Sequence, residues 1–173
     1  MDKSQKEKYF IALGEISAYT NLLERHIFKF IQSIGKFDKA TSYFIFAGED
    51  QKLLLKILDV IIRLRITDPA AISPYERIRG KISEIFEKRN GYLHAVWLFK
   101  GDGDEAIRSK MPRKQLGEFS MPIEEPVPLD ELNEYISEII DATFALVGFC
   151  IKQFPDEANE KTQDTKTEND SQA

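Results

Sequence analysis

A long run of apolar or small residues, spaced alternately three and four positions apart, most constrains how this chain can fold. The run begins at Leu13 and continues with Ile16, Thr20, Leu23, Ile27, Phe30 and Ile34. This spacing places side chains on one face of an α-helix. We therefore predict a helix over residues 5–34, ended by Gly35. Such a helix is longer than the globular average, so it should span a domain and could also offer a surface to a second copy.

Three further helical segments precede the middle of the chain. Residues 38–48 predict a short helix or turn. Residues 53–64 are apolar nearly all round, which is typical of the most buried helix in a bundle. Ser73 and Pro74 match an N-cap followed by proline at the first helical position. The helix that starts there should run on to His94.

The segment from residue 96 to residue 128 interrupts the helical pattern. Apolar stretches at 96–99 and 106–111 flank a glycine- and aspartate-rich turn, which indicates a β-hairpin. The proline-rich stretch 111–128 should lie over the surface as a wrapping segment or edge strand, with an extended piece at 116–121. A last helix opens after this insertion. Its apolar seam is formed by Leu132, Ile136, Ile139, Thr143, Leu146 and Cys150.

The predicted fold is therefore mainly α, a bundle of four to five helices with an inserted β-hairpin and extended segment. At 173 residues, the chain suits one domain of ordinary size. We place that helical domain at residues 1–154. Residues 155–173 contain six acidic and two basic side chains and no large apolar ones, so we expect a disordered acidic tail.

Composition narrows the class of protein. The net charge is −5, and most of it lies in the tail, so the domain has no strong overall field that would demand a nucleic-acid partner. Cys150 is the single cysteine and cannot form an internal disulfide. No run approaches the roughly 20 apolar residues of a membrane span, and the N-terminus lacks the apolar core of a secretory signal. We expect a cytoplasmic protein with no membrane contact.

Residues 87–97 hold the most chemically capable cluster. Asn90 and His94 are four positions apart, so they are neighbours on one face of a helix. Arg89 occupies a position where the pattern would place an apolar residue, and a guanidinium there needs a carboxylate, water or an anion. Gly91 permits close approach of another backbone.

Positive and aromatic side chains surround this cluster in sequence. If the hairpin folds back, they could form a phosphate-binding rim with stacking surfaces. The candidate substrate-binding residues are Lys88, Tyr92, Arg108, Lys110 and Arg113, with Trp97 as a second aromatic. The alternative is a solvated basic strand beside aromatic residues that belong to the core.

Arg89, Asn90 and His94 match the motif Arg-x(4 to 6)-His with asparagine after the arginine, and in this the chain resembles the HEPN superfamily. The resemblance implies an all-helical domain whose catalytic residues are Arg89, Asn90 and His94. It also implies a metal-independent endoribonuclease, a toxin or defence effector, that leaves 2′,3′-cyclic phosphate ends. The implied site is composite, in a homodimer, with RNA as substrate, an antitoxin or other protein as a possible partner, and no cofactor or metal.

The chemistry of the residues fits this activity but allows another interpretation. Imidazole can move protons near neutral pH, and arginine can hold phosphate oxygens. One histidine cannot easily serve as base and acid at once, so a two-fold dimer would supply the second. Alternatively, Arg89 pairs with a buried carboxylate such as Asp59 and His94 bonds a neighbouring helix. The chain would then be a non-catalytic helical interaction or nucleotide-binding module.

Overall fold

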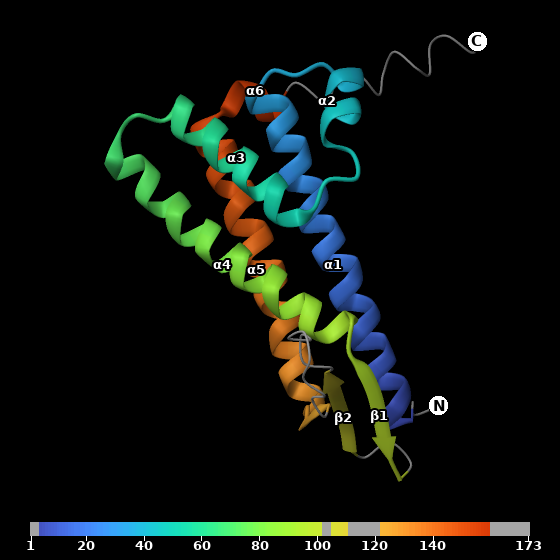
Figure 1. The fold of residues 1–173 in the computed structure, drawn as a ribbon. Helices are drawn as coiled ribbons and strands as arrows, with labels where there is room; N and C mark the ends of the chain where they lie inside the picture. The colour runs from blue at the N-terminus through green and yellow to red at the C-terminus, as the bar shows by residue number, and fades with distance from the viewer. Residues whose placement is uncertain (1–3, 102–104, 111–121, 160–173) are drawn as a thin grey trace, which may run out of the picture. The chain divides into compact units, whose positions relative to one another are not determined.

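The computed structural model describes residues 4–101, 105–110 and 122–159, and these form six helices and three strands (Figure 1). The helices are α1 (Gln5–Ile34), α2 (Lys39–Phe46), α3 (Gln51–Arg65), α4 (Pro69–Leu93), α5 (Leu129–Gln153) and α6 (Pro155–Asn159). The strands are β1 (Val96–Lys100), β2 (Glu105–Lys110) and β3 (Ile123–Pro126). The predicted fold class is confirmed: the chain is mainly helical, with a hairpin inserted between two long helices. The sixth helix is the five-residue α6, at the start of the segment expected to be disordered.

Compact packing divides the chain into two units. The first unit contains residues 1–22 and 82–141, and the second contains residues 23–81 and 142–173. The sheet, the end of α4 and the start of α5 belong to the first unit, together with the start of α1. The second unit holds α2, α3 and α6 with the remaining parts of α1, α4 and α5.

The predicted seam of α1 is buried from Ile16 to Ile34, whereas Leu13 is half-buried. The helix ends near Gly35, as expected, but for a different reason. Lys36, not the glycine, has a positive φ of 55°. A Cβ atom on Gly35 would lie 2.5 Å from the Ile31 carbonyl oxygen and 2.5 Å from the Phe37 ring. Glycine is therefore needed here for close approach of the ring.

Two predictions about the middle helices were wrong. α3 buries only one face, through Leu54, Leu55, Leu58 and Ile62. Its opposite face is open, and Leu64 is 77% exposed. α4 begins at Pro69 rather than Ser73, because Asp68 caps it: the Asp68 carboxylate accepts a bond from Ala70 N–H at 2.9 Å. Pro74 consequently falls inside the helix.

The sheet is antiparallel with strand order β1-β2-β3. The predicted hairpin is confirmed, and β3 adds an edge strand within the proline-rich stretch. The extended piece expected at 116–121 lies outside the described residues. Side chains of β1 alternate between faces: the Trp97 and Phe99 rings lie 6.5 and 5.8 Å from the Tyr9 ring of α1, whereas Val96 and Leu98 are exposed.

Buried tyrosines tie the first unit together. Tyr135 of α5 donates a hydrogen bond to the Ile85 carbonyl of α4 at 2.5 Å, and Tyr9 donates to the Val127 carbonyl at 3.0 Å. The Tyr92 and Tyr135 rings lie 5.2 Å apart. These hydroxyl groups find acceptors inside the protein, as buried polar groups must. Among the described helices, none combines the length and apolarity needed to cross a membrane.

Candidate functional site

The end of α4 carries the motif. The helix ends at Leu93, so His94 lies one residue beyond it, and two residues, His94 and Ala95, separate α4 from β1. The His94 N–H still donates to the Asn90 carbonyl at 3.3 Å, which continues the helical turn. Asn90 and His94 are therefore one turn apart, and both are exposed. An amide and an imidazole thus share one accessible edge.

Arg89 is half-buried and partly engaged. Its Nη1 donates to the Asn90 Oδ1 at 3.1 Å. Its Nε is buried and has no acceptor among the described residues. Burial raises the pKa of Tyr135, with a further rise from Glu138, and the positive charge of Arg89 opposes this shift. Arg89 therefore lies close to the start of α5 and retains capacity for another acceptor.

Asp59, considered as a carboxylate partner for Arg89, takes part in a network of the second unit. It pairs with Arg63 at 3.0 Å and with Arg79 at 3.5 Å. Its charge is therefore compensated by two guanidinium groups of α3 and α4.

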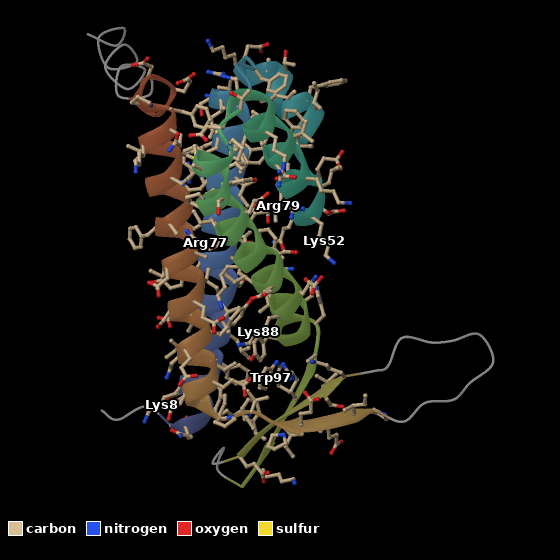
Figure 2. All side chains as sticks on the ribbon, turned by 90° about the vertical axis from the view of Figure 1, so that its left-hand side faces the viewer. Lys8, Lys52, Arg77, Arg79, Lys88 and Trp97 are labelled. Carbon is tan, nitrogen blue, oxygen red and sulfur yellow. The ribbon has the colours of Figure 1, made fainter. Side chains whose placement is uncertain are left out.

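Lys88 is the first of the predicted substrate-binding residues, and it leans toward α5. Its Nζ lies 4.8 Å from the centre of the Tyr135 ring. Figure 2 shows Lys88 near the end of α4 and Trp97 just beyond it, where β1 begins. A cation over an aromatic face is held weakly when exposed, so Lys88 can still reach an anion.

β2 brings two more predicted residues to the helix end. The guanidinium carbon of Arg108 lies 4.8 Å from the centre of the Tyr92 ring. The Nζ of Lys110 would be 3.2 Å from a Cβ atom on Gly91, so the absence of a side chain at Gly91 makes room for it. Arg108 and Lys110 therefore lie beside the helix that carries Arg89, Asn90 and His94. Arg113 lies outside the described residues.

Tyr92 is a correction to the predicted site. Its side chain is fully buried, its hydroxyl donates to the Glu131 carboxylate of α5, and its ring stacks on Trp97 at 6.3 Å. Burial, then the bond to Glu131, raises the pKa of Tyr92. The ring already has Arg108 and Trp97 against it, so it supports the site and offers no free face to a base.

Sequence reasoning missed two carboxylates. Glu125 of β3 accepts a bond from the Arg108 Nη2 at 2.5 Å and lies 3.9 Å from the Lys110 Nζ. Arg108, then Lys110, lowers the pKa of Glu125. Glu131 was missed as the acceptor for Tyr92. The signal in the sequence that could have found Glu125 was indirect. A largely buried arginine such as Arg108 requires an anion. Glu124 and Glu125 are the nearest acidic pair downstream of the prolines at 112 and 122.

The positive charge at this site is local. Residues 82–141 contain seven Lys and Arg against thirteen Asp and Glu. Attraction of a polyanion therefore depends on the few cations at the end of α4 and on β2, and not on the field of the whole unit. In the described ranges, no group of three or more His, Cys, Asp or Glu is arranged to hold a metal ion.

Comparison with protein-family models, with curated proteins and with solved structures gave no significant match.

Proposed function

We propose that this protein is a metal-independent endoribonuclease with a composite active site in a homodimer. One observation carries the proposal: exposed Asn90 and His94 lie one turn apart, Arg89 is bonded to Asn90, and Arg108 and Lys110 lie beside the same helix end. This arrangement combines a proton carrier with several phosphate ligands. It agrees with the roles that the resemblance to the HEPN superfamily implies.

The proposed reaction is transesterification. His94 of one protomer removes the proton from the ribose 2′-hydroxyl, and the 2′-oxygen attacks the adjacent phosphorus. The bond from phosphorus to the 5′-oxygen breaks, and the leaving oxygen takes a proton from the second His94. The products are a 2′,3′-cyclic phosphate and a 5′-hydroxyl. Arg89 stabilises the charge that develops on the phosphate oxygens, and Asn90 holds Arg89 in position.

The proposed reaction requires a dimer, because the general base and the general acid are the His94 side chains of two protomers. Base and acid must both be present during one turnover, and the chain has a single motif. A two-fold axis close to His94 would bring two copies of the motif into one cleft. RNA as substrate is consistent with a cytoplasmic protein, and a cleaving enzyme of this kind could act as a toxin or defence effector held in check by a protein partner.

The direct test is cleavage of a fluorescent single-stranded RNA by the unmodified protein and by His94→Ala. Loss of His94 should slow cleavage by at least about 100-fold, the usual contribution of a general acid or base. His26→Ala is the matched control, because His26 lies on α1 in the second unit and should leave the rate unchanged. Equal cleavage by His94→Ala would remove the catalytic assignment.

Mixing experiments test the composite site. If each turnover needs His94 from both protomers, dilution with co-refolded His94→Ala should reduce activity with the square of the unmodified fraction. A linear decrease would show that one protomer is sufficient. Detection of 2′,3′-cyclic phosphate ends would identify the reaction. Such ends resist phosphatase alone, and they become sensitive to periodate only after acid opens the ring and phosphatase then removes the resulting monophosphate.

A second candidate function is a non-catalytic helical interaction module. The observation that favours it is a run of three exposed apolar side chains on α2 of the second unit, where Tyr43 is 61% exposed, Phe44 92% and Ile45 46%. Large exposed apolar patches mark interaction surfaces. Phe44→Ser should then abolish partner binding, whereas His94→Ala should leave it intact. If instead His94→Ala abolishes RNA cleavage and Phe44→Ser leaves it intact, the result supports the nuclease.

A further inference from the structure

The Glu125 carboxylate does not satisfy all the hydrogen-bond donors of Arg108 and Lys110. Glu125 uses one oxygen, Oε2, for both cations. The 2.5 Å contact to Arg108 Nη2 is a hydrogen bond, but the 3.9 Å separation from Lys110 Nζ is too long for one. The Nε of Arg108 is buried and has no acceptor among the described residues. Two cations therefore face an anion that satisfies only part of their donor capacity.

Arg108 is held in position independently of Glu125. Its guanidinium lies over the buried Tyr92 ring, which is itself fixed by Glu131 and Trp97. Only 12% of the Arg108 side chain is exposed. Lys110 reaches the same place across Gly91, where no side chain intervenes. Loss of Glu125 would therefore leave the two cations close together, with their mutual repulsion uncompensated.

Glu125 has the most exposed side chain of the three. Its side chain is 46% exposed, and it stands on β3, a four-residue edge strand. Ion pairs that remain open to water contribute little stability, because water and salt compete for both partners. A phosphodiester carries the same single negative charge but has two free oxygens in a tetrahedral arrangement. It can accept from Arg108 and Lys110 at once, which one carboxylate oxygen does not achieve here.

We propose that Arg108 and Lys110 form a phosphate-binding pair, that Glu125 occupies this pair in the free protein, and that an RNA phosphodiester binds by displacing the Glu125 carboxylate. The inference rests on the proposed function for the choice of RNA as the ligand. Glu125 acts as an internal competitor that lowers the affinity of the Arg108–Lys110 pair for any phosphate group. Anions that cannot supply two oxygens gain nothing by replacing it.

The test compares Glu125→Gln with Glu124→Gln. Both variants remove one negative charge from β3, but neighbouring residues of a strand point to opposite faces, and Glu124 pairs across the sheet with Ser109. The probe is a fluorescein-labelled 2′-O-methyl RNA hexanucleotide, which cannot be cleaved through its 2′-oxygen, followed by fluorescence anisotropy. Glu125→Gln should tighten binding by about two- to fivefold, the upper part of the range expected for removing a solvent-exposed competing ion pair. Glu124→Gln should change binding less than twofold.

A further variant separates competition from general charge. When Glu125→Gln is combined with Lys110→Ala, the double variant should bind RNA no more tightly than the unmodified chain, because one of the two phosphate ligands is gone. Thermal unfolding of each variant checks that the chain is folded. Unchanged or weaker RNA binding by folded Glu125→Gln would overturn the proposal, as would equal gains in Glu124→Gln and Glu125→Gln.

The outcome is distinguishable from that of the nuclease assay. If Glu125→Gln binds the oligonucleotide more tightly and no form of the chain cleaves ordinary RNA, the phosphate pair stands and the catalytic proposal fails. If the unmodified protein cleaves RNA in a His94-dependent way and Glu125→Gln binds like the unmodified chain, the nuclease stands and the role of Glu125 is refuted.

Discussion

Replacement of Tyr92 by phenylalanine removes one oxygen atom and tests how the site is supported. Tyr92 is fully buried, and its hydroxyl joins the end of α4 to Glu131 at the start of α5. Phenylalanine keeps the ring under Arg108 and against Trp97. The perturbation is therefore confined to one hydrogen bond to a carboxylate.

The expected cost follows from that bond. A hydrogen bond to a charged group contributes about 1.5–3 kcal/mol to the free energy of unfolding. Glu131 is half-buried and can recover water as a partner, so the value should fall at the low end. We expect Tyr92→Phe to lower the free energy of unfolding by about 1.5 kcal/mol at pH 8.

The difference in stability between Tyr92→Phe and the unmodified chain should shrink as the pH rises above 10. Burial and Glu131 raise the pKa of Tyr92 above its ordinary value of 10.0. Below pH 10 both the folded and unfolded chains keep the phenol proton, so the full stabilisation is present. Above pH 10 the unfolded chain loses this proton while the folded chain keeps it. The free energy of unfolding of the unmodified chain therefore falls by about 1.4 kcal/mol per pH unit. Phenylalanine has no such proton, so the two stability curves should meet near about pH 11.

Urea unfolding at pH 8, 10, 10.5 and 11, followed by circular dichroism, measures both quantities. Tyr75 and Tyr135, whose pKa values are also raised by burial, titrate equally in both proteins and cancel in the difference. Tyr43→Phe is the control, because Tyr43 is 61% exposed and should give no difference at any pH. Equal stability of Tyr92→Phe and the unmodified chain at pH 8, or a constant difference up to pH 11, would refute the reasoning.

Three other substitutions or reactions have clear expected outcomes. Gly35→Ala should lower the free energy of unfolding by about 1–3 kcal/mol, because its Cβ would lie 2.5 Å from backbone and ring atoms; a thermal melt like that of the unmodified chain would contradict this. Gly91→Ala should raise helix stability by up to about 1 kcal/mol, since the close contact at 3.2 Å is with the flexible end of Lys110; chemical denaturation showing a loss would mean that Lys110 cannot move. Burial raises the pKa of Cys150 to about 12, so its thiol should react with a disulfide reagent at pH 8 only as fast as the protein unfolds; rapid reaction of the folded chain would exclude the buried position.

The long helices were predictable because each carries its own periodic signal. The seams of α1 and α5 are continuous in sequence, and the structure buries them nearly as predicted. The start of α4 was not decidable in this way, since Asp68-Pro69 and Ser73-Pro74 both match a capping signal. The exposed face of α3 was missed because an apolar pattern does not say which sides of a helix find partners.

The candidate site shows the same division between local and distant information. The spacing of Asn90 and His94 on one turn is local and was predicted from sequence. The positions of Glu125 and Glu131 depend on the pairing of β3 with β2 and on the packing of α5, which are contacts between segments far apart in sequence. Burial of Tyr92 depends on the same contacts, and for that reason its availability to RNA was misjudged.

The short connection between α4 and β1 makes this region intolerant of changes in chain length. One inserted residue at His94 or Ala95 would shift β1 by one position, and a shift of one exchanges the two faces of a strand. Trp97 and Phe99 would turn toward solvent, while Val96 and Leu98 would turn toward Tyr9. Homologous chains should therefore vary in length at the turn between β1 and β2, and keep the distance from Asn90 to Trp97 constant.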